Sequence, residues 1–115
     1  MATTIEDHKL DALFTALSDR TRRDIVARLS TGEATVKELA EPYAMSMQAV
    51  SQHIRVLERS GLISQGRHRQ TRPCRLEPAA LEAALFWIEE SRRAWSERMD
   101  RLETHLASLQ ERENQ

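Results

Sequence analysis

The sequence predicts a mainly α-helical domain that contains one small β-hairpin and ends in a long helix. Three observations indicate this class: apolar residues recur at spacings of three and four through most of the chain, one stretch near the middle breaks that spacing, and glycine and proline are few. With 115 residues, 40% of them hydrophobic and 30% charged, the chain can bury a modest core. We therefore expect a single domain over residues 1–115.

Charge is sorted along the chain, although the net charge is only −1. Residues 18–76 hold eleven Lys and Arg against six Asp and Glu, whereas the two ends together hold six against twelve. Neutralising the phosphates of a duplex requires cations concentrated on the surface that meets it. The distribution therefore favours a nucleic acid as the partner of the middle of the chain.

The sequence shows no features of a membrane-spanning, secreted or metal-binding protein. It has no apolar run of membrane-spanning length, and its start, MATTIEDHKL, has no apolar signal core, so we expect a cytoplasmic protein with no membrane partner. The lone Cys74 cannot form an internal disulfide or supply a multi-cysteine zinc site. We expect no metal and no cofactor.

The first helix is predicted over residues 7–17, where one face is strongly apolar. This face consists of Leu10, Leu13, Phe14 and Leu17.

The second helix is predicted over residues 18–32, with Ser18 as its cap and Gly32 at its end. Its inward residues are Ile25, Val26 and Leu29. Its first turns also carry Arg20, Arg22 and Arg23, where the helix dipole disfavours cations. These arginines meet an anion such as a phosphate, or they are solvated and paired with Asp19 or Asp24.

Residues 35–60 predict a short helix, a tight turn and a second helix. Thr35 and Glu38 have the spacing of a capping box, and Pro42 ends the helix that this box begins. Ser46 can cap the next helix, and Gly61 suits the left-handed position after its end. The link is so short that the two helices must pack at a steep angle, as in a helix-turn-helix.

The helix over residues 46–60 is expected to contact DNA through its outward face. Its inward residues are Met47, Val50, Ile54 and Leu57. The outward and flanking residues are Ser46, Gln48, Ala49, Ser51, Gln52, His53 and Arg55. Gln can bind both edge atoms of adenine and Arg those of guanine, so we expect this face in the major groove. On this helix alone, a merely solvated face would be the simpler interpretation.

Residues 62–76 lose helical spacing and predict two short strands joined around residues 68–70, which form a basic wing beside the helix-turn-helix. The residues expected to contact a phosphate backbone or a minor groove are Arg67, His68, Arg69 and Arg72. No acidic residue occurs between Arg59 and Arg75, so an ordinary exposed basic loop is the second interpretation.

A long helix over residues 78–112 completes the predicted winged helix-turn-helix. Its apolar seam alternates spacings of four and three through Leu81, Leu85, Ile88, Arg92, Trp95, Met99, Leu102, Leu106 and Leu109. So small a domain cannot cover this stripe itself, so we expect a homodimer. The predicted interface consists of Leu10, Leu13, Phe14, Leu85, Ile88, Trp95, Met99, Leu102 and Leu106. Arg92 interrupts the seam: it pairs with Glu89 or a partner acid, or it marks an anion-binding cavity, and pairing is the preferred interpretation.

The stretch AVSQHIRVLERSGLI followed by a wing, together with ALSDRTRRDIVARL, resembles the ArsR-type (ArsR/SmtB-like) family of winged helix-turn-helix repressors. The resemblance implies a dimeric transcriptional repressor that releases its operator when a signal arrives, and the sequence names no inducer. By position it assigns to DNA Gln48, Ser51, Gln52, His53, Arg55 and residues 67–72.

Two departures point to the non-metal-sensing branch of that family. Related metal sensors carry a Cys-x-Cys site on the third helix, whereas VKELAEPY has no cysteine, and the terminal helix has only His105 where others have a histidine pair. The wing also carries Arg72, Pro73 and Cys74 where the family usually has tyrosines.

Three other functions compete with that of a repressor. An enzyme is the weakest, because His8, His53, His68 and His105 lie on different elements and there is no glycine-rich phosphate loop. A dimeric protein-interaction module without specific DNA binding would leave the basic middle unexplained. A thiol-switched repressor could use Cys74, because a thiol between Arg72 and Arg75 tends toward thiolate, but a half-buried strand cysteine is the preferred interpretation.

Overall fold

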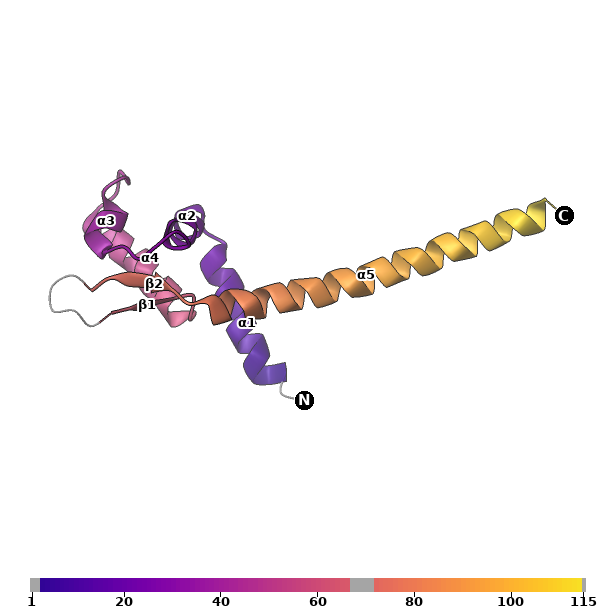
Figure 1. Cartoon of the computed structure of the whole chain (residues 1–115), viewed down its shortest axis with the longest axis horizontal. Coiled ribbons are helices and arrows are strands. Elements are labelled where there is room, and N and C mark those ends of the chain that lie inside the picture. Colours follow the sequence, from indigo (N-terminus) through magenta and orange to yellow (C-terminus); the bar gives the residue numbers. More distant parts are fainter. Residues whose placement is uncertain (1–2, 67–71, 115) are drawn as a thin grey trace. The chain divides into compact units, whose positions relative to one another are not determined.

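The computed structural model describes residues 3–66 and 72–114, with side chains from Asp7 onward. Its elements in chain order are α1 (Thr3–Leu17), α2 (Arg20–Leu29), α3 (Val36–Ala40), α4 (Met47–Arg59), β1 (Ile63–Gln65), β2 (Cys74–Leu76) and α5 (Pro78–Glu113) (Figure 1). This order confirms the predicted fold class. The chain divides into two units, Met1–Ala84 and Leu85–Gln115, which are described separately.

The helix α4 lies at the centre of the first unit, where it contacts α1, α2, α3 and β1. Its inward residues Val50, Ile54 and Leu57 are fully buried, as predicted. The rest of the core consists of Leu13, Ala16, Ile25, Leu29, Leu39, Leu62, Ile63, Cys74 and Ala84. Met47 was expected among them, but its side chain is 50% exposed because the buried arc of α4 begins one turn later, at Val50.

The ends of the helices are set by short-range hydrogen bonds. Asp19, not the predicted Ser18, caps α2: its backbone is extended and its carboxylate accepts from the Arg22 amide at 3.0 Å. Ser18 instead donates its hydroxyl to the Thr15 carbonyl at 2.6 Å. The capping box of α3 is confirmed, because Thr35 and Glu38 exchange bonds of 2.9 and 3.1 Å.

Side chains of α2, chiefly Arg28, stabilise the turn between α3 and α4. The Arg28 guanidinium donates to the carbonyls of Glu38 and Leu39, at 3.0 and 2.9 Å, which satisfies the end of α3. The same guanidinium lies 5.7 Å from the centre of the Tyr43 ring, and the Tyr43 hydroxyl donates to the Asp24 carboxylate. These contacts fix the angle at which the chain enters α4.

The hairpin is antiparallel, with Ile63 opposite Leu76 and Gln65 opposite Cys74. Its free edge is paired as well: the Cys74 amide donates to the Ala34 carbonyl at 2.7 Å, and the Ala34 amide donates back at 3.2 Å. The base of the wing is therefore tied to the segment that precedes α3. The predicted residues Arg67, His68 and Arg69 lie outside the described residues.

The helix α5 begins in the first unit, where Ala80, Leu81 and Ala84 pack against the core. Leu81 therefore belongs to this core rather than to an uncovered seam. Leu13 was predicted at a dimer interface, but its side chain is 3% exposed, because it packs in the core of its own domain. Of the other two predicted interface residues of α1, Leu10 is partly buried and Phe14 is 37% exposed.

The second unit, over its described residues, is a single helix with no other element to cover its apolar side chains. The seam residues Leu85, Ile88, Trp95, Leu102, Leu106 and Leu109 are each at least 41% exposed. Arg92 pairs with Glu89 at 2.9 Å, which confirms the preferred interpretation of that position. Within the described residues, no helix combines the length and the apolar character required to cross a bilayer.

Candidate nucleic-acid interface

The outward face of α4 carries hydrogen-bonding side chains and almost no negative charge. Gln48, Gln52 and Arg55 are exposed, and the only acidic residue in the helix, Glu58, stands in its last turn. Ala49 and Ser51 are half-buried at the edges of this face. The Ser46 hydroxyl oxygen accepts from the Ala49 amide at 3.1 Å, and its own O–H remains available as a donor. The first turns of α4 therefore offer donors and acceptors to a ligand.

Gln52 and Arg55 form a pair within this face. The Arg55 Nη1 donates to Gln52 Oε1 at 3.1 Å. An amide oxygen has two lone pairs, so Oε1 can accept a second bond while the two N–H donors of the same amide stay free. Reading adenine needs one acceptor and one donor from Gln, so Arg55 can orient Gln52 without blocking that contact.

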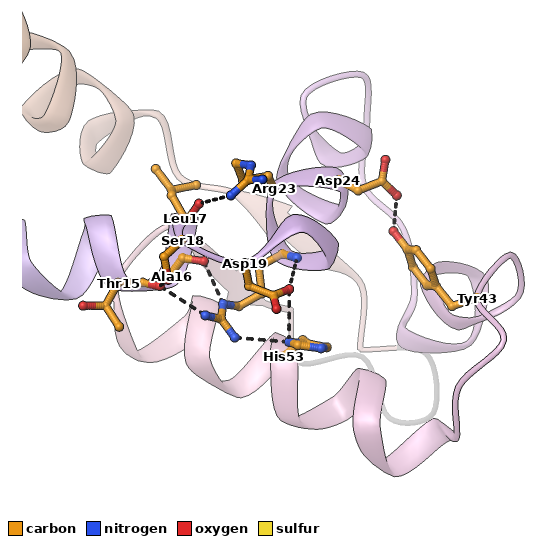
Figure 2. A network of polar contacts seen from close by, with 10 residues as sticks. Thr15, Ala16, Leu17, Ser18, Asp19, Arg23, Asp24, Tyr43 and His53 are labelled. Atoms are coloured by element: carbon orange, nitrogen blue, oxygen red, sulfur yellow. Dashed lines mark hydrogen bonds and ion pairs between the residues drawn. The ribbon is translucent and has the colours of Figure 1, made fainter.

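His53, which the sequence pattern placed at the flank of the outward face, contacts the start of α2. Its Nδ1 lies 3.2 Å from Arg22 Nη1 and 3.8 Å from Asp19 Oδ2, and its side chain is 22% exposed (Figure 2). The imidazole is thus part of the contact between α4 and the start of α2. A histidine one position beyond an outward residue lies at the side of a helix, where a neighbouring helix can reach it.

The arginines at the start of α2 bind main-chain carbonyls, which neither sequence interpretation anticipated. Arg22 donates to Ala16 and Thr15, at 2.7 and 3.1 Å, and Arg23 donates to Leu17 at 2.8 Å (Figure 2). The last carbonyls of a helix lack partners within it and carry the negative end of its dipole, so they attract guanidinium groups. These arginines close the end of α1.

The carboxyl of Asp19 is stabilised in its charged form at this junction. Its pKa lies below the ordinary value of 3.8, chiefly because the Arg22 amide donates to it and also because His53 and the Arg22 guanidinium lie nearby. The α2 cap therefore stays ionised at neutral pH.

Cys74 is fully buried on the inward face of β2, so the preferred interpretation of a strand cysteine holds and the alternative of a thiolate is wrong. Burial, with a smaller effect of the Glu58 charge, raises the pKa of the thiol to about 11. The neighbouring Arg75 points to the opposite face of the strand, where its guanidinium lies 3.5 Å from the Glu77 carboxylate. Although Arg75 is adjacent to Cys74 in sequence, its charge therefore lies away from the sulfur and is paired with a carboxylate.

The described part of the wing contributes two exposed cations, Arg72 and Arg75. Arg75 is paired with Glu77, and Arg72 adopts a left-handed backbone with φ of 31°. Within residues 3–66 and 72–114, no group of three His, Cys, Asp or Glu side chains is placed to hold a metal ion.

The side chain of Met47 was missed by the sequence analysis. It is exposed at the first turn of α4, next to Gln48, and Met45 just before the helix is 37% exposed. The helical spacing of Met47, Val50, Ile54 and Leu57 assigns Met47 to the core. Only the structure shows that the buried arc begins one turn later, at Val50.

Comparison with known proteins places this arrangement among DNA-binding regulators. A family model described as a helix-turn-helix domain matches residues 17–65. The HTH-type transcriptional regulator Rv2034 of Mycobacterium tuberculosis is 41% identical over 73 residues, which cover 64% of this chain and 68% of that protein. The transcriptional repressor SdpR of Bacillus subtilis is 30% identical over 79 residues, covering 69% of this chain and 88% of SdpR.

A solved structure is similar over most of its length. The ArsR family transcriptional regulator RHA00566 superposes with a TM-score of 0.74 at 38% identity, covering 78% of this chain and 93% of its own.

Proposed function

Because the chain belongs to the ArsR-type family of winged helix-turn-helix transcriptional regulators, we propose that it is a homodimeric repressor that binds an inverted-repeat operator in double-stranded DNA. The observation that carries the proposal is the exposed face of α4, where Gln48, Gln52 and Arg55 stand clear of any carboxylate in the first three turns. These side chains match the hydrogen-bonding edges of base pairs in the major groove.

In this proposal the contacts divide into two kinds. Gln48, Gln52 and Arg55 contact base edges, with Ser46, Ala49 and Ser51 at the margins of the helix. The wing cations, of which Arg72 is described and exposed, lie along the phosphates or in the adjacent minor groove. The further wing residues of the proposal are Arg67, His68 and Arg69. Base contacts select the sequence, and phosphate contacts supply salt-dependent affinity.

The dimer is proposed from the uncovered seam of the second unit. Large apolar side chains that repeat in register over many turns are ordinarily covered by a partner helix. The proposed interface residues in α5 are Leu85, Ile88, Trp95, Met99, Leu102 and Leu106, with Leu10 and Phe14 from α1. A two-fold dimer would present its two α4 helices to half-sites about 34 Å apart, one turn of the duplex.

The test is selection of bound sequences from a random duplex pool, followed by titration of the selected sequence against salt. We expect an inverted repeat whose half-site centres lie about 10 base pairs apart, bound by a dimer with a steep salt dependence. Sedimentation of the complex reports its stoichiometry. If no sequence is enriched even in dilute buffer, specific DNA binding is contradicted and a protein-interaction module becomes the better function. If the protein binds DNA as a monomer, the proposed two-fold dimer is contradicted.

A further inference from the structure

The Arg22 side chain connects three helices through one guanidinium group. Its Nε and Nη2 donate to the last carbonyls of α1, those of Ala16 and Thr15, at 2.7 and 3.1 Å. Its Nη1 lies 3.2 Å from Nδ1 of His53 on α4 (Figure 2). Arg22 itself belongs to the first turn of α2. The group therefore spans the junction of α1, α2 and α4 in the first unit.

The chemistry of the two side chains determines which atom donates. A guanidinium has donors and no acceptor, so a hydrogen bond at 3.2 Å requires an unprotonated His53 Nδ1. The Asp19 carboxylate, at 3.8 Å from the same nitrogen, is beyond hydrogen-bonding distance. Because the guanidinium is a planar fork with fixed donor directions, two bonds to α1 leave the third donor little freedom to move.

We propose that Arg22 is a positioning residue that fixes the orientation of α4 relative to α1 and so sets the half-site spacing that the dimer prefers. The inference rests on the proposed function, in which α1 contributes to the dimer interface and α4 reads the bases. If α1 is held at the two-fold axis, any rotation of α4 against α1 changes the separation of the two reading helices.

Arg23 provides a matched comparison within the same turn of α2. It also donates to a terminal carbonyl of α1, that of Leu17 at 2.8 Å, yet it has no described contact with α4. If Arg22 merely stabilised the end of α1, loss of either arginine would have the same effect. If it positions α4, only the loss of Arg22 should alter spacing preference.

The experiment measures binding of full-length protein to a series of selected operators whose spacer is shortened or lengthened by one base pair. The variants are Arg22→Lys, His53→Ala, His53→Asn and Arg23→Lys. Arg22→Lys keeps the positive charge but lacks the planar set of guanidinium donors. His53→Asn places an amide oxygen, also an acceptor, where the histidine has Nδ1. We expect Arg22→Lys and His53→Ala to reduce the ratio of preferred to altered spacing by about tenfold, the scale of one hydrogen bond to a charged group. His53→Asn and Arg23→Lys should retain the wild-type ratio.

Binding to a random duplex separates positioning from two other roles. A phosphate contact by Arg22, or general destabilisation, would weaken random and selected DNA alike, and either result overturns the inference. Should Arg22→Lys fail to fold, the contrast between His53→Ala and His53→Asn decides, because His53 supplies only an acceptor. If wild-type protein binds no duplex selectively, the proposed function itself fails, whereas selective binding with unchanged spacing ratios overturns this inference alone.

Discussion

Truncation of Gln52 is the sharpest test of the α4 surface. The side chain is exposed, and its one described bond is the 3.1 Å contact from Arg55. Gln52→Ala removes this bond and any contact with a base, while leaving the buried face of α4 unchanged. We expect weaker binding to the operator without a loss of folding stability.

The expected effect of Gln52→Ala on folding stability is much smaller than its expected effect on operator affinity, so the two can be measured separately. A side-chain pair at this spacing on an exposed helix contributes about 0.2–0.5 kcal/mol, and alanine's better helix propensity offsets part of that loss. A bidentate contact with a base contributes about 1–3 kcal/mol, which corresponds to a loss of about 5- to 150-fold in operator affinity. The midpoint of urea unfolding should therefore barely move.

The assay is a fluorescence anisotropy titration of operator and random duplexes at a fixed salt concentration. Gln110→Ala, which changes the same residue type in the second unit, is the matched control and should bind both duplexes as wild-type protein does. Because Arg55 orients Gln52, the double variant Gln52→Ala/Arg55→Ala should lose less affinity than the two single losses combined. Equal losses on random and operator DNA for Gln52→Ala would refute the assignment of this side chain to a base.

Three further outcomes follow from side chains whose surroundings differ from the sequence expectation. Met47→Ala should weaken operator binding about fourfold, because contact of its exposed side chain with a thymine methyl contributes about 0.8 kcal/mol, and this loss should vanish when that thymine is replaced by uracil. If uracil leaves the loss intact, Met47 does not meet a methyl group. Cys74, whose pKa is raised to about 11, should resist iodoacetamide at pH 7.5 in folded protein and react in urea, as followed by mass spectrometry. Rapid alkylation of the folded protein would restore the thiol switch. Asp19→Asn keeps a capping side chain but removes a carboxyl whose pKa is lowered by folding, so the wild-type advantage in unfolding free energy should be present above pH 3.8 and disappear as the pH falls below that value. An advantage that persists at pH 2.5 would contradict this linkage.

The elements that the sequence predicted correctly depend on local patterns. The capping box of Thr35 and Glu38, the buried arc through Val50, Ile54 and Leu57, and the left-handed Gly61 after α4 each involve residues within a few positions of one another. Short-range spacing is enough to specify such features, because helical periodicity and capping are properties of consecutive residues.

Several features that the sequence did not reveal depend on contacts between residues far apart in the chain. His53 pairs with Arg22 across 31 positions, and the carbonyls that Arg22 binds belong to the main chain of α1, which leaves no mark on side-chain pattern. Cys74 lies between arginines in sequence, but alternation along a strand and burial under the hairpin determine its charge state. The cap of α2 is a local exception: the sequence predicted Ser18, but the adjacent Asp19 has the extended backbone of a cap and accepts from the Arg22 amide three positions on.

The two bonds that join Ala34 to Cys74 have a consequence for how the wing can evolve. With one strand pinned on both of its edges, the length of the segment between Gly66 and Pro73 can change without shifting the register below it. Insertions there would therefore leave the paired strands and the core beneath them unchanged. A proline at position 34, by contrast, would remove the donor to the Cys74 carbonyl and weaken the tie between the hairpin and the segment that precedes α3.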